Sequence, residues 1–374
     1  MTIKGKNIKS HETIDYIDVD MPEDPDGLSE DDVVKADTAM ECAMAQRTAT
    51  RIQGITRLAD QFSTAFMPNY IEKHMESLLY LGHKLSRKTA EEGIALIRLI
   101  ANTSIQMGDM IDMIDQMKEM RQVMMHSTNC QFQEYCAIAS AVITRMSCAA
   151  SEVAAENLGA CAKVINDTVA TSENGAFIAA AITSWCMLLE DCDPKTVTNA
   201  FELQPVLYEL LRSSVLEVRL SAGEALAFLH EYRSGVEFEN HDDVMDTLSD
   251  MRGLLGKQIS KKSRRLQRSS IKQVYEFING DSGPEYTIGA NMVTLKSFAM
   301  KMFYDCCCDV MNGGIDIHLM RNDKLRMVFG LESAPIELEP VSTEEKRSEK
   351  TSYRKNQKAR SKLRKLERSD CIDY

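Results

Sequence analysis

The residue types that most often carry chemistry occur here in spacings that do not build a reactive or metal-binding site. His126 and Cys130 lie four residues apart on one predicted helix and Cys136 follows, but a zinc site would need two further ligands. The three consecutive cysteines at 306–308 lack CxxC spacing. Consecutive helical residues point about 100° apart, so these thiols cannot chelate one ion together. We interpret all these cysteines as helical core residues, with some thiol left exposed at 306–308.

Further candidates for catalysis are equally weak. His318 falls one predicted helix after the cysteine run, where packing or capping explains it better than catalysis. The chain contains no GxGxxG or GxxxxGKS/T phosphate loop and no GxSxG nucleophile elbow. Residues 1–10 are polar and basic, so we expect no signal peptide and a reducing compartment for the 11 cysteines. The sequence therefore predicts no catalytic residue, no metal ligand and no cofactor, and the chain is not expected to be an enzyme.

Charge is the chemical property that this sequence does concentrate. Residues 257–272 hold seven Lys or Arg and no acid, residues 346–368 hold eleven Lys or Arg and two acids, and residues 12–32 hold ten acids and no base. The net charge of the whole chain is −12, so the two basic segments carry +16 and everything else −28. This separation predicts that the basic segments dock a polyanion locally on a body that otherwise repels one.

The second basic segment predicts a helix that is charged on every face and has no apolar seam to bury. Like charges four residues apart destabilise such a helix in isolation, whereas binding RNA would remove the repulsion and let it fold. A nuclear-localisation signal and a plain solvated tail are the alternatives. The residues predicted to contact RNA are all Lys or Arg: Lys261, Lys262, Arg264, Arg265, Arg268, Lys272, Arg354, Lys355, Lys358, Arg360, Lys362, Arg364, Lys365 and Arg368.

Composition and periodicity predict an all-helical scaffold for these segments. Gly (18) and Pro (8) are scarce and aromatic residues make up 6%, which favours helices over sandwiches or barrels. No apolar run is long enough to span a membrane. Paired helices at a loose spacing of about 40 residues predict an armadillo- or HEAT-like solenoid, with a helical bundle as the alternative. The clearest repeat helix is 215–231, whose small residues at 221–225 let a neighbour approach closely.

Local signals place further elements. The methionines at 107, 110, 113, 117, 120 and 124 step by three and four and predict one continuous apolar stripe in the core. Asp193-Pro194 predicts a helix start, and Asn174-Gly175 predicts a break before a helix at 176–189. The remaining expected elements are helices at 137–146, 149–164, 261–278, 298–311 and 316–329 and a hairpin of 286–288 with 292–295.

The expected organisation has five parts. The N-terminal part is interpreted as a solubilising tail; the alternatives are an interaction arm, or an arm that shields the basic segments until a partner competes. The parts are an acidic disordered arm (1–35), armadillo-like repeats (36–256), a small, mostly helical C-terminal cap domain (257–331), a linker (332–352) and a basic C-terminal helix (353–370).

Several of these segments resemble the interferon-related developmental regulator family. The family usually has Trp where Phe298 stands, and the resemblance covers most of 40–370. The matching stretches are Thr183–Leu189, Ser221–Ala227, Lys261–Arg265, Tyr275–Phe277, Tyr286–Gly289, Leu295–Phe298, His318–Phe329 and Lys355–Arg368.

The resemblance implies a non-enzymatic armadillo-like protein with two functional descriptions. One is association with translationally inactive ribosomes, with the body in the tRNA sites and the C-terminal helix in the mRNA path of the small subunit. The other is nuclear transcriptional co-regulation, with the solenoid or the acidic arm as a scaffold for protein partners. The charge map favours the first description. We therefore expect a cytoplasmic protein, with the nucleus as a second location, that binds rRNA and needs no membrane and no small-molecule substrate.

Overall fold

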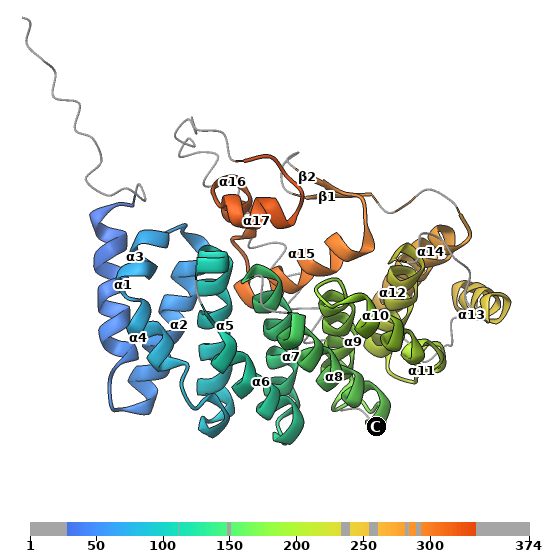
Figure 1. Cartoon of the computed structure of the whole chain (residues 1–374), viewed down its shortest axis with the longest axis horizontal. Coiled ribbons are helices and arrows are strands. Elements are labelled where there is room, and N and C mark those ends of the chain that lie inside the picture. The colour runs from blue at the N-terminus through green and yellow to red at the C-terminus, as the bar shows by residue number, and fades with distance from the viewer. Residues whose placement is uncertain are drawn as a thin grey trace, which may run out of the picture.

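The computed structural model describes residues 28–110, 112–147, 151–232, 240–253, 261–280, 283, 285–288 and 293–333. These residues form an elongated array of paired helices, and a two-stranded hairpin follows the array in the chain (Figure 1). The all-α solenoid-like fold predicted from the sequence is confirmed. The basic helix expected at 353–370, and with it the residues Arg354 to Arg368, lies outside the described residues.

One row of helices, here called the inner row, runs through the whole array because each member packs on the next. Its members are α2 (Thr48–Thr64), α5 (Ala90–Met107), α7 (Cys130–Met146), α9 (Gly175–Leu189), α12 (Leu216–Tyr232) and α14 (Lys261–Ile278). Their first residues are 40 to 45 positions apart, which is the repeat length that the sequence predicted.

A second row, here called the outer row, supplies the partner helix of each repeat. Most of its helices pack on the inner helix that follows them in the chain. They are α1 (Glu30–Ala43), α3 (Pro68–Lys73), α4 (Met75–Leu81), α6 (Ile114–His126), α8 (Ser151–Asp167), α10 (Pro194–Ala200), α11 (Gln204–Leu210) and α13 (His241–Gly253). Short 3-10 turns join some of them: η1 (Leu85–Arg87), η2 (Gly108–Met110) and η3 (Phe201–Leu203).

The inner helices are parallel to one another. Near the start of α2, Arg51 bonds Glu92 of α5, 41 residues later, and towards its end the Ala59 carbonyl accepts a bond from Asn102, 43 residues later. Contacts that keep a nearly constant sequence offset along two helices require those helices to run in the same direction. The solenoid therefore has an amino edge, where all inner helices begin, and a carboxyl edge, where they end.

The C-terminal segment returns across the array instead of extending it. After the hairpin of β1 (Tyr286–Ile288) and β2 (Val293–Leu295), α15 (Phe298–Met311) crosses the inner row and contacts α2, α5, α7, α9 and α12. The short helices α16 (Ile315–Arg321) and α17 (Asp323–Val328) then pack on α2, α5 and α7 (Figure 1). The expected cap domain (257–331) is thus divided: α14 continues the inner row, whereas α15 to α17 cover the inner face of the repeats.

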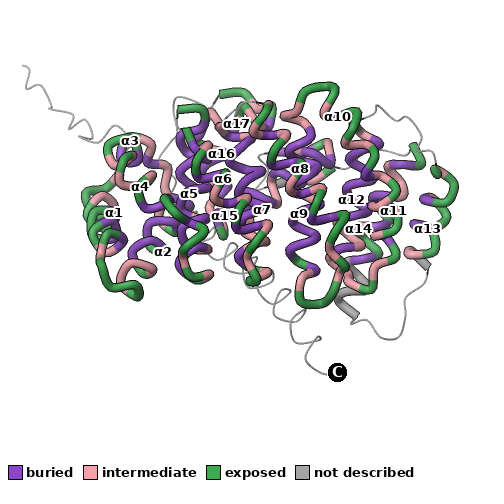
Figure 2. The backbone as a smooth tube through the Cα atoms, turned by 60° about the horizontal axis from the view of Figure 1, so that its bottom comes forward, coloured by how far each residue is buried: buried purple, intermediate pink, exposed green. Residues whose placement is uncertain are grey.

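This cover is apolar where it meets the inner row, so one continuous core joins the two (Figure 2). Phe298 and Phe303 of α15 are almost fully buried, and so is Leu325 of α17. Polar bonds fix the position of the cover: the Nδ2 of Asn322 donates to the carbonyl of Ile105 at 2.7 Å, and the Nε of Arg98 donates to the carbonyl of Val310 at 3.3 Å.

Gly314 is the residue that allows this return path. It caps α16 with a φ of +82°, a region that side chains with a Cβ rarely adopt. A Cβ at this position would lie 1.8 Å from the carbonyl oxygen of Ser63, at the end of α2. The chain can therefore turn from α15 onto α2 with glycine, and not with a larger residue.

Most of the local sequence signals are confirmed. Helices α14 and α15 have the predicted bounds, and the two strands pair antiparallel with Tyr286 opposite Leu295. Asp193 caps α10 by accepting bonds from the backbone N–H groups of Lys195 and Thr196. The predicted close approach to 221–225 is also present, since a Cβ on Gly223 would lie 3.3 Å from Ile271 of α14.

Three local predictions are wrong. The methionine stripe is divided between α5 and α6, because the chain turns at Gly108, and Met110 is exposed while the other five are buried. The helix expected at 316–329 breaks at Asn322, whose side chain instead caps α17 by accepting a bond from the N–H of Leu325. Helix α1 begins at Glu30, inside the segment expected to be a disordered arm.

Candidate nucleic-acid interface

Helix α14 is the described element on which the first predicted basic segment lies. It carries Lys261, Lys262, Arg264, Arg265, Arg268 and Lys272 in its first twelve residues, so the basic segment occupies the end of α14 at the amino edge. The side chains of the first four lie outside the described residues, whereas Arg268 and Lys272 are exposed. Since these two residues are four apart on one helix, they lie on one face.

The opposite face of α14 anchors the helix to the end of the solenoid. Ile271, Val274 and Ile278 are buried between α12 and α13, at the three- and four-residue spacing of an amphipathic helix. Full burial of each side chain contributes about 1.5–3 kcal/mol. The basic face is therefore presented by a helix whose position the core already determines.

A polar seam adds to this anchoring. Arg219 of α12 donates to the Oε1 of Gln267 at 3.1 Å and to the carbonyl of Ser213 at 2.7 Å, and Gln267 donates to the carbonyl of Met251 at 3.4 Å. One side chain of α14 is thus bonded to both helices that support it. This seam limits rotation of α14 about its own axis, which would move the basic face.

Charges of both signs lie around α14, because α13 carries four exposed aspartates, at 242, 243, 246 and 250. Lys272 pairs with Glu276 of the same helix at 3.5 Å, but both side chains are exposed, and such a pair holds little energy against a competing phosphate. Arg252 of α13 adds a further cation, since its guanidinium lies 4.4 Å from the ring centroid of Tyr275. Arg252 was missed in the sequence because it follows several acids and lies outside the basic segment 257–272. Its closeness to Lys257 in the chain was the available signal.

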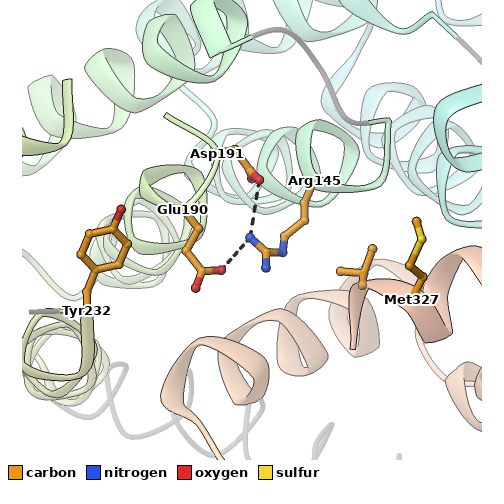
Figure 3. A pocket seen from close by; sticks show the side chains of 6 residues that line it. Arg145, Glu190, Asp191, Tyr232 and Met327 are labelled. Carbon is orange, nitrogen blue, oxygen red and sulfur yellow. Dashed lines mark ion pairs between the residues drawn. The ribbon is translucent and has the colours of Figure 1, made fainter. Parts of the chain in front are cut away.

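A hollow at the carboxyl edge has a different character. It has a volume of about 490 Å³ and is lined by Arg145, Glu190, Asp191, Tyr232, Met327 and Val328 (Figure 3). The Nη1 of Arg145 lies 2.6 Å from the Oε2 of Glu190 and 3.5 Å from the Oδ1 of Asp191. Burial raises the pKa of Asp191 to about 6. Two carboxylates against one guanidinium make this hollow a poor site for phosphate.

The residues first weighed for chemistry have structural surroundings. His126 ends α6 and Cys130 begins α7, so the expectation that they share one helix is wrong. All three cysteines at 306–308 are buried, so the expected exposed thiol there is also wrong, and burial raises the pKa of Cys306 and Cys307. In the described ranges no group of three or more His, Cys, Asp or Glu side chains is arranged to hold a metal ion.

His318 confirms the packing interpretation. It is fully buried under α2, where its Nε2 lies 3.1 Å from the carbonyl oxygen of Phe62. Burial lowers the pKa of this imidazole to about 4, so the ring is neutral at physiological pH. A neutral, buried imidazole bonded to a backbone carbonyl holds α16 on the inner row.

The surface on which a peptide-binding solenoid would act is occupied by the chain itself. Helices α15, α16 and α17 cover the inner face from α2 to α12. The surfaces left for a large partner are therefore the two edges, the outer row and the ends.

Among the helices of the described ranges none is long and apolar enough to cross a membrane.

Comparison with known proteins gives one family. The sequence profile of the interferon-related developmental regulator family matches residues 6–279. The match thus starts before the stretch 40–370 that the resemblance covers, and it ends before the hairpin and the basic tail.

Individual relatives carry the same family name. Interferon-related developmental regulator 2 of Mus musculus is 32% identical over 161 residues, which are 41% of this chain and 36% of that protein. Interferon-related developmental regulator 1 of Homo sapiens is 27% identical over 212 residues, which are 55% of this chain and 47% of that protein. This chain therefore spans less than half the length of these relatives. A solved engineered protein has a TM-score of 0.42 at 16% identity, over 66% of this chain and 98% of its own.

Proposed function

The chain belongs to the interferon-related developmental regulator family, and we propose that it is a non-enzymatic, ribosome-binding factor that silences translation. Its body would occupy tRNA sites, and its basic C-terminal segment would lie as a helix in the mRNA path of the small subunit. The partner is rRNA, and the protein acts in the cytoplasm.

The observation that carries this proposal is the separation of charge on a rigid frame. The body is strongly acidic outside the two basic segments, yet Arg268 and Lys272 project from a helix that the core and the Arg219–Gln267 seam hold in place. A preorganised basic face costs little entropy to dock on phosphates. A body that repels polyanions elsewhere restricts docking to that face and to the tail.

The occupied inner face supports an RNA partner over a peptide partner. A scaffold that binds peptides in its concave face needs that face open, and here α15 to α17 fill it with buried apolar side chains. The alternative of a nuclear co-regulator would have to use the outer row or the acidic arm.

Removal of residues 341–374 tests the role of the tail. Residues 346–368 carry eleven Lys or Arg, and each phosphate that the protein no longer neutralises lowers the slope of log affinity against log salt by about 0.7–0.9. We expect the truncated chain to leave ribosomes at a much lower salt concentration than the intact chain in sedimentation through sucrose. Removal of residues 1–27, which also shortens the chain but takes acidic residues, is the matched control and should not weaken binding. Equal sedimentation of the truncated and intact chains would contradict the proposed tail.

Recovery from cells separates the ribosome proposal from the alternative. Pull-down of the intact chain before and after RNase treatment should recover ribosomal subunits in an RNA-dependent manner. Recovery of chromatin-associated proteins that resists RNase, without ribosomes, would favour the co-regulator.

A further inference from the structure

Two turns at the far end of the amino edge from α14 carry a second group of exposed cations. The turn that precedes α2 ends at Arg47, and the turn that precedes α5 contains Lys84 and Arg87. All three residues are exposed, and none has an ion-pair partner in the described part of the chain. Here they are called the N-terminal basic turns.

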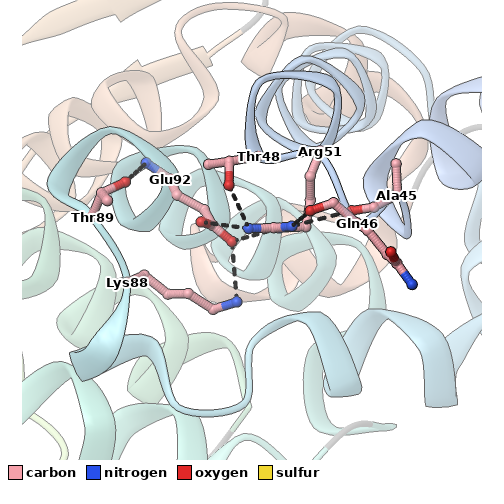
Figure 4. A network of polar contacts seen from close by, with 7 residues as sticks. All are labelled: Ala45, Gln46, Thr48, Arg51, Lys88, Thr89 and Glu92. Atoms are coloured by element: carbon pink, nitrogen blue, oxygen red, sulfur yellow. Dashed lines mark hydrogen bonds and ion pairs between the residues drawn. The ribbon is translucent and has the colours of Figure 1, made fainter.

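A buried ion-pair network holds the two turns together (Figure 4). Glu92, whose side chain is 4% exposed, accepts two bonds from Arg51, at 2.8 and 3.0 Å. Arg51 also donates to the carbonyls of Ala45 and Gln46 in the first turn, while Lys88 of the second turn lies 3.0 Å from Glu92. One carboxylate and one guanidinium thereby join the two turns.

The second turn is fixed further by its backbone. Lys84 has a φ of +56°, which is uncommon for a residue with a side chain and persists where the surroundings determine the conformation. The N–H of Ser86 donates to the Oε2 of Glu119 on α6 at 2.9 Å. Lys84 and Arg87 are thus presented from a turn that is tied to both neighbouring helices.

The network also accounts for the sign of the exposed charge. In the sequence 84–92 three cations face two carboxylates, Glu91 and Glu92. Glu92 is buried and already neutralised by Arg51 and Lys88, so the acids left beside Lys84 and Arg87 are the exposed Glu91 and the half-buried Glu119. With Arg47, the three cations of the N-terminal basic turns outnumber these two acids by one.

The N-terminal basic turns and α14 are the two ends of one edge. Parallel inner helices place the starts of α2, α5 and α14 on the amino edge, with three further helices between α5 and α14. Adjacent packed helices lie about 8–10 Å apart, so α14 lies roughly 30–40 Å from α5 and roughly 40–50 Å from α2. The edge between them carries both signs of charge: Asp167 and Glu173 lie in and beside the turn before α9, Lys163 lies near the end of α8, and Arg212, before α12, pairs with Glu209.

We propose that the N-terminal basic turns form a second phosphate-binding site, so that one folded RNA is gripped at both ends of the amino edge. This inference rests on the proposed RNA partner and adds a location and a size to it. The separation and the mixed charge between the two groups do not favour a short single strand that follows the whole edge. They fit the sugar-phosphate backbone of a structured RNA that approaches the edge at two points.

The test neutralises the three cations in the full chain, as R47Q/K84Q/R87Q, and measures binding to purified ribosomes over a range of salt. If each of the three cations neutralises one phosphate, the triple variant should lower the salt slope by about 2–3 and weaken binding roughly tenfold or more at low salt. The matched control R57Q/K118Q/K195Q removes the same charge from exposed cations outside the amino edge. It should leave the slope nearly unchanged.

The outcomes separate the two proposals when the variant R268Q/K272Q of α14 is measured beside them. An unchanged slope for R47Q/K84Q/R87Q, with weaker binding by R268Q/K272Q, overturns the second site and leaves the proposed function standing. Equal weakening by the triple variant and its control also overturns the site, because it shows a general effect of charge. Failure of the intact chain to bind ribosomes overturns both proposals. Circular dichroism of each variant checks that the fold is intact, as expected because these exposed side chains contribute little to its stability.

Discussion

Helix α14 and the segment α15–α17 follow one another in the chain, yet α14 keeps one face exposed whereas α15 is packed into the core. On α14 one face is buried against α12 and α13, and the other carries exposed Arg and Lys. On α15, by contrast, Phe298, Phe303 and the cysteines at 306–308 are all buried, because this helix lies across the inner row. A helix at the end of a solenoid has a free face for a partner, whereas a helix across its inner face becomes core. The position of a helix in the array thus decides whether its side chains are exposed to a partner or buried in the core.

The largest expected difference between the two regions is in stability. Replacement of Phe303 by Ala removes a buried ring that packs on Phe329, with ring centroids 5.1 Å apart, and should lower the free energy of unfolding by about 3–5 kcal/mol. Urea unfolding followed by circular dichroism measures this change. F303L, which keeps much of the volume, should cost far less. A decrease below about 1 kcal/mol for F303A would mean that α15 is not part of the core.

The buried His318 of α16 predicts that the free energy of unfolding depends on pH. Its pKa is about 4 in the folded chain and about 6.5 when unfolded, so the unfolded chain binds the proton first as the pH falls. Stability from this residue is present above pH 6.5 and is lost between pH 6.5 and 4, by up to about 3 kcal/mol. Asp191, with its pKa raised to about 6, acts in the opposite direction.

A comparison of the intact chain with H318Q isolates the contribution of the histidine to the pH dependence of stability, because both proteins contain Asp191. The difference in free energy of unfolding between them should change between pH 7 and pH 5, with the intact chain losing more stability. A difference that is constant over this range would show that the imidazole titrates normally. The α14 variant R268Q/K272Q serves as a reference that should not alter the pH profile.

The smallest effect on stability, and a clear effect on binding, is expected for R268Q/K272Q itself. Both side chains are exposed, so the free energy of unfolding should change by no more than about 0.5 kcal/mol. The salt slope of ribosome binding should fall by about 2, one for each phosphate that these two cations neutralise. A variant that binds ribosomes like the intact chain would remove α14 from the proposed interface.

Sequence periodicity was sufficient to predict the bounds and the buried face of individual helices. Helix α14 shows its apolar side at Ile271, Val274 and Ile278, and the small residues around Gly223 predicted the close neighbour that α14 turned out to be. Repeat spacing likewise predicted the solenoid. These features follow from the helical repeat and side-chain size, which are properties of short segments.

The destination of α15–α17 could not be predicted from the same patterns. Periodicity shows that Phe303 is buried but not which helix covers it. His318 and Asn322 bond residues more than 200 positions earlier in the chain. The break at Asn322 had a local signal, since Asn-Asp is a common helix start. The N-terminal basic turns were missed because Arg47, Lys84 and Arg87 form no run in the sequence and meet through folding alone.

The return of the chain across the inner row also sets an order of events during synthesis. His318 meets Phe62 across 256 residues, and Asn322 meets Ile105 across 217. At a translation rate of about 5–20 residues per second, the first repeats wait roughly 10–50 s for the segment that covers them. During that interval the nascent repeats display an uncovered apolar face. The covered solenoid can therefore form only after α17 has left the ribosome, long after the first repeats have been made.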